Sequence, residues 1–166
     1  MSRVPRLPLL GGFVLLLLSC GGEDDPLSPS FPADYAASYV EVRDCRFSGE
    51  HDLSPVRVLT DPNAAEAYIN RDREFAEGAV IIKAEYDFAD PACEGEIQRW
   101  TVMVREAAES APERLDWYWQ DVDAGRAVVS ENDTRCVGCH TGCGAPPDGY
   151  LGTCSIGASF GALGSP

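Results

Sequence analysis

Basic residues are scarce in this chain of 166 residues. Lysine and arginine together number 13, against 27 aspartates and glutamates, and the formal net charge is −14. Proteins bind a phosphate backbone through a basic face, so this composition excludes nucleic acid as a partner. The scarcity is greatest for lysine, because Lys83 is the single lysine and every other basic residue is arginine.

A long apolar run is also lacking. A membrane-spanning helix needs about 20 apolar residues, and the apolar stretch after Arg3 and Arg6 is shorter and ends just before Cys20. This layout is typical of a secretory signal and resembles a bacterial lipoprotein signal. We expect residues 1–19 to be removed as a lipoprotein signal peptide and Cys20 to be lipidated. The alternative is an ordinary signal peptide followed by a coincidental cysteine.

The expected mature protein is exported and lipid-anchored to a bacterial membrane, facing the periplasm or the cell exterior. Its contact with the membrane is expected only through the lipid. Residues 20–33 are rich in Gly, Ser, Pro and acidic residues, which predicts a flexible tether. Residues 34–160 should form one domain, which at this size buries enough surface for one core.

The chain has neither an internal repeat nor a regular alternation of strands and helices. Asp61 and Pro62 predict the start of a helix that ends before Gly78. Alternating apolar residues predict strands over residues 39–47, 56–59, 78–88, 97–105, 115–122 and 126–130, the last two joined by a turn at 123–125. The predicted class is α+β, mainly antiparallel β-sheet with a few short helices.

The strand predicted over residues 78–88 has two distinct faces, because side chains alternate along a strand. One face carries Val80, Ile82, Tyr86 and Phe88, and the other carries Ile81, Lys83, Glu85 and Asp87. Two readings of Lys83 stay open: it faces a cofactor, or it pairs with Glu85 at a wet surface, where an ion pair contributes little.

The motif that carries chemistry is Cys136-Val137-Gly138-Cys139-His140. C-x-x-C-H is the attachment motif of a c-type haem. Two thiols three positions apart on a tight turn can reach the two vinyl groups of one porphyrin, and the following His140 can ligate the iron as proximal ligand. Bacteria attach this haem outside the cytoplasm, so the motif and the expected export support each other.

Three other readings of the motif stay open. Cys136, Cys139, His140 and Cys143 together offer four ligands for zinc or an iron–sulfur cluster. The pair Cys136 and Cys139 could also be a redox dithiol, although the usual strand-then-helix setting is absent. A plain structural disulfide between the two is the third reading.

Four further cysteines remain after Cys20 and the motif. An even number in an oxidising compartment predicts two disulfides, with three pairings open. A bridge between Cys143 and Cys154 would fix the loop after the haem motif, which leaves Cys45 to pair with Cys93. We predict this pattern.

Residues able to close the second axial position of the iron are few. His51 is the one histidine outside the motif, and Met103 is the one methionine after the start. An exposed loop histidine and a strand methionine are more often ordinary surface and core residues. Trp100, Trp117 and Trp119 are predicted core residues, and Trp117 and Trp119 could also wall a haem pocket because they share a face.

Several blocks in order over residues 35–155 resemble the cytochrome P-460 family. The stretch 56–62 before an alanine-rich helix is similar to the family's early strand and helix. The stretch 75–83 resembles its most recognisable block, and 100–105 and 115–119 resemble the next two strands. The C-x-x-C-H motif completes the order.

This resemblance implies a small, mainly antiparallel β protein, usually a homodimer, with a five-coordinate c-type haem. In enzymatic members, a lysine at the position of Lys83 is cross-linked to the haem edge, and those members oxidise hydroxylamine. Related c-prime-beta cytochromes lack the cross-link and bind nitric oxide. The chain departs from the family pattern at Lys83-Ala84-Glu85, where glutamate usually follows the lysine directly, and at Cys143 and Cys154, which replace an aromatic-rich ending.

Two main function classes follow. The first is an oxidoreductase that acts on a small nitrogen compound, such as hydroxylamine or nitric oxide, at an open iron site. The second is a non-catalytic monohaem cytochrome that binds nitric oxide or transfers electrons to a partner that the sequence does not identify. A third class, with less support, is a disulfide-stabilised lipoprotein without haem.

Overall fold

The structure is a computed structural model that describes residues 27–49, 51–143 and 149–154. The expected signal peptide and the lipidation site at Cys20 lie outside these residues. The elements in chain order are α1 (Tyr35–Ser38), β1 (Val40–Phe47), β2 (Pro55–Thr60), α2 (Pro62–Asn70), β3 (Val80–Tyr86), β4 (Ile97–Arg105), the 3-10 helix η1 (Pro112–Arg114), β5 (Trp117–Asp123), β6 (Val128–Glu131), α3 (Thr134–Gly142), β7 (Gly149–Tyr150) and β8 (Thr153–Cys154).

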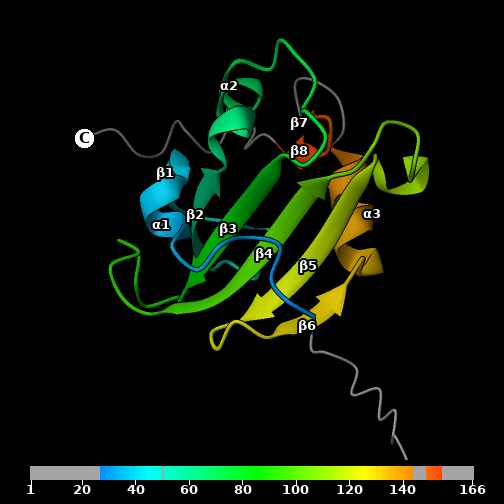
Figure 1. Cartoon of the computed structure of the whole chain (residues 1–166). Helices are drawn as coiled ribbons and strands as arrows, with labels where there is room; N and C mark the ends of the chain where they lie inside the picture. Colours follow the sequence, from blue (N-terminus) through cyan, green and yellow to red (C-terminus); the bar gives the residue numbers. More distant parts are fainter. Residues whose placement is uncertain (1–26, 50, 144–148, 155–166) are drawn as a thin grey trace, which may run out of the picture.

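The first six strands form one sheet in sequence order, and every neighbouring pair is antiparallel. β7 and β8 form a separate two-stranded hairpin, which lies near α3 (Figure 1). The predicted α+β class with a mainly antiparallel sheet is therefore confirmed, and each predicted strand is present with slightly different ends. None of the helices in the described part of the chain is long and apolar enough to cross a membrane.

Helix α2 begins where the sequence predicts. The Asp61 carboxylate accepts a hydrogen bond from the backbone N–H of Asn63 at 2.8 Å, and Pro62 occupies the first turn. The second Asp61 oxygen accepts from the backbone N–H of Val80 at 2.6 Å, which fixes the start of α2 against β3. The helix ends at Asn70, and the following Arg71 has a left-handed φ of 54°.

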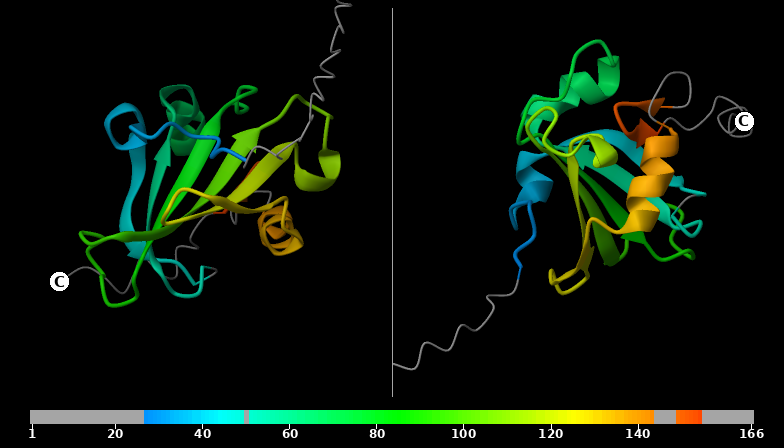
Figure 2. Two further views of the ribbon diagram at one scale, coloured as in Figure 1. Left: turned by 60° about the horizontal axis from the view of Figure 1, so that its bottom comes forward. Right: turned by 90° about the vertical axis from the view of Figure 1, so that its right-hand side faces the viewer.

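The sheet is covered on both faces. One face, led by Ile82, Val102 and Trp100, packs against Phe31 and Tyr35 of the N-terminal part. The opposite face packs against α2 through Ala64, Ala67 and Tyr68, and against α3 through Cys136 and Val137. In the right-hand view of Figure 2, α1 (blue) and α3 (orange) lie on opposite sides of the sheet.

The expected tether is shorter than the sequence predicts. Phe31 is only 4% exposed, and its ring lies 5.2 Å from that of Tyr35 and 5.7 Å from that of Trp100. Its carbonyl accepts a hydrogen bond from Arg126 at 2.8 Å. The expectation of a flexible tether is therefore wrong for residues 28–33, because Phe31 packs on the sheet and the Gln120 side chain bonds the backbone of Ser28 and Ser30.

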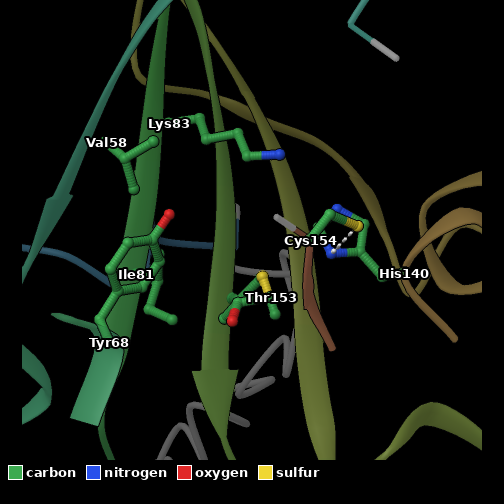
Figure 3. A pocket seen from close by; sticks show the side chains of 8 residues that line it. Val58, Tyr68, Ile81, Lys83, His140, Thr153 and Cys154 are labelled. Carbon is green, nitrogen blue, oxygen red and sulfur yellow. Dashed lines mark hydrogen bonds between the residues drawn. The ribbon is translucent and has the colours of Figure 1, made fainter. Parts of the chain in front are cut away.

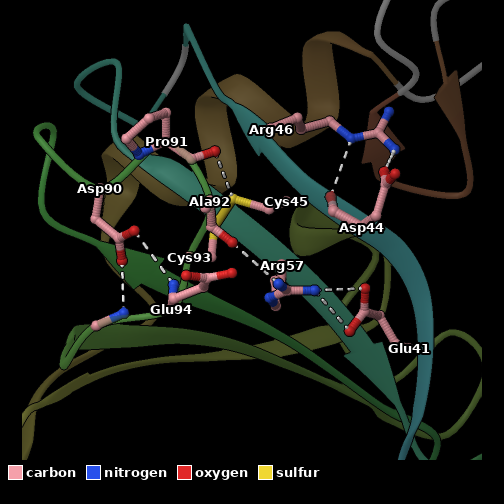
Figure 4. The surroundings of a disulfide bond; sticks show 11 residues. Glu41, Asp44, Cys45, Arg46, Arg57, Asp90, Pro91, Ala92, Cys93 and Glu94 are labelled. Atoms are coloured by element: carbon pink, nitrogen blue, oxygen red, sulfur yellow. Dashed lines mark hydrogen bonds and ion pairs between the residues drawn. A yellow bond between two sulfur atoms is a disulfide. The ribbon is translucent and has the colours of Figure 1, made fainter.

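The Cys45–Cys93 disulfide joins β1 to the loop after β3, with the Cα atoms 5.7 Å apart. Arg57 lies beside it, pairs with Glu41 at 2.9 Å and donates to the carbonyl of Ala92 at 3.1 Å (Figure 4). This edge of the sheet is thus closed by a covalent bond and an ion pair, far in sequence from the C-x-x-C-H motif.

Candidate functional site

The C-x-x-C-H motif lies on a helix, and not on the tight turn that the sequence suggested. The Asp133 carboxylate caps α3 by accepting from the backbone N–H of Arg135 at 2.7 Å. Positions three apart lie on the same side of a helix, so the half-buried Cys136 and the exposed Cys139 are presented together. Both thiols are free.

The bonding of the cysteines counts against two of the three other readings of the motif. A disulfide between Cys136 and Cys139 is wrong for this structure, because neither sulfur is bonded to the other. A four-ligand zinc or cluster site fails as well, since Cys143 is bonded to Cys154 with the Cα atoms 5.2 Å apart. Two unbonded thiols followed by His140 remain, which is the donor set that c-type haem requires; the same two thiols leave the redox-dithiol reading open.

His140 is buried, with 8% of its surface exposed, and its ring lies 4.6 Å from that of Trp119. Its Nδ1 lies 2.6 Å from the carbonyl oxygen of Gly152. A carbonyl can only accept, so Nδ1 carries the hydrogen and the lone pair of the neutral ring is on Nε2. Burial, aided by the charge of Lys83, lowers the pKa of His140 to about 3, so the ring is neutral at physiological pH.

The β7–β8 hairpin supplies this carbonyl. Gly152 has a φ of +84°, and a Cβ there would lie 3.3 Å from the indole nitrogen of Trp117. The same indole donates to the carbonyl of Leu151 at 2.7 Å. The turn therefore needs glycine, and it presents two successive carbonyls, one to Trp117 and one to His140.

A small cavity of about 20 Å³ lies between the hairpin, α3 and the sheet, with room for roughly one water molecule. It is lined by Val58, Tyr68, Ile81, Lys83, Met103, His140, Thr153 and Cys154. Lys83 extends from its strand toward Cys154 and His140 (Figure 3). The structure thus brings the predicted cross-link residue and the predicted iron ligand to the walls of one cavity.

The reading of Lys83 as one half of a wet surface pair is wrong. Some of the residue is accessible, but its amine is enclosed, and Nζ lies 2.6 Å from Nε2 of His51. Burial lowers the pKa of Lys83 to about 8, against the opposing effect of Glu85. Glu85 is only 3% exposed and does not bond Lys83 directly; it accepts from His51.

His51 differs most from expectation, because its side chain is only 11% exposed. Its Nδ1 lies 2.7 Å from Glu85, and since a carboxylate accepts, Nδ1 donates and Nε2 accepts from Lys83. Both ring nitrogens are thus engaged, which leaves no nitrogen for iron in this arrangement. Burial lowers the pKa of His51 despite its bond to Glu85.

Glu85 continues the chain of polar groups toward the surface. Its second oxygen lies 2.9 Å from Nε of Arg99, whose side chain is 38% exposed. Arg99 in turn lies 3.7 Å from the carboxylate of Asp121. The chain Lys83–His51–Glu85–Arg99 therefore connects the cavity to solvent.

Met103, the other candidate for the second axial position, lies on β4 and is 5% exposed. It packs in the same cluster as Trp117 and Trp119, so its role as a core residue is supported, although its side chain also lines the cavity. All three tryptophans named by the sequence are buried.

Two features of the site were not found from the sequence: the burial of Glu85 and the carbonyl of Gly152 that contacts His140. Alternation placed Glu85 on the face of Lys83, but nothing local indicated that this face would be covered. Nothing in the sequence indicated the role of the Gly152 carbonyl, because the position of a backbone oxygen depends on the fold and not on its own residue type.

The residues fit haem by their donor set. Cys136 and Cys139 supply two free thiols on one side of α3, and His140 supplies a neutral ring with its lone pair on Nε2. The cavity is smaller than a porphyrin, so the fit comes from these donors and not from volume.

Comparison with known proteins supports this chemistry. The model of one protein family, described as Cytochrome P-460, matches residues 32–146, which is more than half of the chain. No curated protein matches the chain.

Proposed function

Because the chain belongs to the cytochrome P-460 family and is therefore a haem protein, we propose that it is an oxidoreductase acting on a small nitrogen compound such as hydroxylamine or nitric oxide. The observation that carries this proposal is the enclosed amine of Lys83, held 2.6 Å from His51 on the wall of the cavity that His140 also lines.

Three residues of α3 would hold the cofactor. The thiols of Cys136 and Cys139 would form the thioether bonds of haem c, and Nε2 of His140 would ligate the iron. When bound, the haem supplies an iron that exchanges electrons with a small ligand.

The chain's own residues would manage protons. Oxidation of hydroxylamine releases protons together with electrons, so an acceptor has to lie near the reacting molecule. Lys83 Nζ donates to His51 Nε2, and His51 Nδ1 donates to Glu85. This geometry is that of a reactive group, a base and a residue that orients the base, and Arg99 extends it to the surface.

The alternative is a cytochrome that binds nitric oxide or transfers electrons without turning over substrate. One observation favours it: the Lys83 amine already has a close partner in His51, so it can be satisfied without a bond to haem. Under this alternative Lys83 would be a hydrogen-bond donor at the cavity and not a reactive group.

The test compares purified holoprotein with Lys83→Arg, measuring haem content, absorption spectrum and hydroxylamine-dependent reduction of an artificial electron acceptor. Arginine keeps the charge but is a poor nucleophile and proton donor. We expect normal haem content with loss of at least about 10²-fold in rate, the usual minimum for losing a proton-transfer group. Mass spectrometry of tryptic peptides then shows whether haem carries a Lys83 peptide besides the α3 peptide.

An unchanged rate and spectrum in Lys83→Arg would eliminate the enzyme and leave the binding or electron-transfer cytochrome. Glu66→Gln is the matched control, because Glu66 is an exposed residue of α2 whose side chain pairs only with Arg73 among the described residues. It should retain full activity.

We also propose export and lipid anchoring at Cys20. Support comes from the leader sequence and from the two disulfides, since disulfides persist in oxidising compartments. The mass of the mature N-terminal peptide should include lipid on Cys20, and Cys20→Ser should abolish the modification. An unmodified Cys20 in membrane-fractionated cells would contradict the proposal.

A further inference from the structure

The Cys143–Cys154 disulfide has no part in the chemistry proposed above, yet it lies against the predicted iron ligand. The donor atoms of His140, Cys143 and Cys154 all lie within 4.8 Å of one another. Cys154 Sγ is 4.0 Å from His140 Nδ1, the same nitrogen that bonds Gly152. The disulfide therefore lies beside the hydrogen bond between His140 Nδ1 and the Gly152 carbonyl, which affects how strongly His140 Nε2 can donate to a metal.

The chain closes a small ring around that hydrogen bond. Cys143 follows His140 by three residues at the end of α3, and Cys154 follows Gly152 by two residues in β8. The disulfide joins Cys143 to Cys154, and the hydrogen bond joins His140 to Gly152. Each link therefore restrains the distance across the other.

Besides the packing of Tyr150 and Leu151 against the cluster around Trp117, two hydrogen bonds to residues outside α3 hold the hairpin. β7 and β8 have two residues each and pair over two positions, and an isolated two-stranded hairpin is at best marginally stable in water. Trp117 holds the Leu151 carbonyl, and the Tyr150 hydroxyl donates to the carbonyl of Arg73 at 2.8 Å. Neither contact ties the hairpin to α3.

We propose that the Cys143–Cys154 disulfide positions the Gly152 carbonyl on Nδ1 of His140 and so sets the donor strength of His140 toward the haem iron. A hydrogen bond from the far nitrogen of a ligating histidine raises the basicity of the ligating nitrogen. A more basic ligand stabilises ferric over ferrous iron, so the disulfide lowers the reduction potential. The inference rests on the proposed function, because it requires iron at Nε2.

The test uses the holoprotein and two matched double variants. Cys143→Ser with Cys154→Ser removes the bridge beside His140, while Cys45→Ser with Cys93→Ser removes the bridge at the far edge of the sheet. Loss of a hydrogen-bond partner of a metal ligand changes metal affinity or activity about 10–100-fold, and we take tenfold for the ferric-to-ferrous equilibrium. For a one-electron couple, tenfold in the equilibrium constant is about 59 mV.

We expect the first variant to raise the midpoint potential by about that amount and to lower the frequency of the iron–histidine stretch in the ferrous Raman spectrum. The far-edge variant should match the parent in both. Equal potentials and frequencies in all three proteins, with full haem content, would overturn the inference and leave the proposed function intact. A parent protein without covalent haem would instead refute the proposed function.

A second measurement covers the case in which the first variant fails to fold. A thiol reductant is added to the folded far-edge variant, where Cys143–Cys154 is the remaining bridge among the described cysteines, and the iron–histidine stretch is followed. The frequency should fall as the bridge opens and recover on reoxidation. An unchanged frequency, with alkylation proving that both thiols are free, overturns the inference.

Discussion

The rarest functional side chains of this protein lie together. The chain has two histidines and one lysine, and the rings of His51 and His140 are 6.5 Å apart, with Lys83 hydrogen-bonded to His51. Burying such groups is unfavourable unless each has a partner. Here the partners are Glu85 for His51 and the Gly152 carbonyl for His140, which explains how three ionisable groups share one small region.

Stability should depend on pH through His51. Burial lowers the pKa of His51 in the folded protein, whereas in the unfolded chain it is about 6.5. Below that pH the unfolded state binds more protons, so the free energy of unfolding falls as pH falls. His51→Gln, which keeps an acceptor for Lys83, should make the decrease between about pH 7 and about pH 5 shallower. Urea unfolding at several pH values measures this slope.

A slope identical to that of the parent would contradict the assignment of a neutral, buried His51. The comparison is made between variant and parent because His140, whose pKa is also lowered, contributes in the same direction in both proteins.

Among the elements, α2 depends most visibly on one residue. Asp61 accepts hydrogen bonds from the backbone of Asn63 and of Val80, so it caps the helix and attaches it to β3. Asp61→Ala should lower the free energy of unfolding by about 1–2 kcal/mol, the upper part of the range for an N-cap. Equilibrium urea unfolding provides the value.

Asp72→Ala is the matched control, because Asp72 pairs with Arg73 at an exposed site, where ion pairs contribute at most about 1 kcal/mol. If Asp61→Ala and Asp72→Ala lowered the free energy of unfolding equally, Asp61 would stabilise the protein no more than an exposed ion pair does.

Strands in which apolar and polar residues alternate could be predicted from the sequence. β3 is an example, since alternation correctly places Val80, Ile82 and Tyr86 on one face and Ile81 on the other. Helix α3 was missed because Gly138, Gly142 and β-branched residues give it low helix propensity, and the Asp133 cap and packing on the sheet compensate. That the Lys83 face would be covered could not be predicted, because the cover comes from α3 and β7–β8, far along the chain.

At the scale of the whole molecule, the N-terminal segment 28–33 behaves as part of the domain. Phe31 is the residue that anchors it, and Arg126 stacks on its ring at 4.3 Å. Phe31→Ala should lower the free energy of unfolding by about 3–5 kcal/mol, as for other buried phenylalanines. Leu27→Ala is the control, because Leu27 is 56% exposed and its loss should cost less than about 0.5 kcal/mol.

Thermal unfolding of both variants checks the segment. If Phe31→Ala were as stable as Leu27→Ala, residues 28–33 would not contribute to the stability of the domain, and the expectation of a tether over residues 20–33 would stand.

The order of the strands has a consequence for how the protein matures. Each strand from β2 to β6 pairs with the strand made just before it, and such local contacts favour rapid folding. A chain that emerges N-terminus first completes this sheet before α3 appears. Cys136, Cys139 and His140 are thus made after all six strands of the sheet against which α3 packs. Attachment of the cofactor therefore becomes a late step, and a failed attachment would leave a folded sheet and not an unfolded chain.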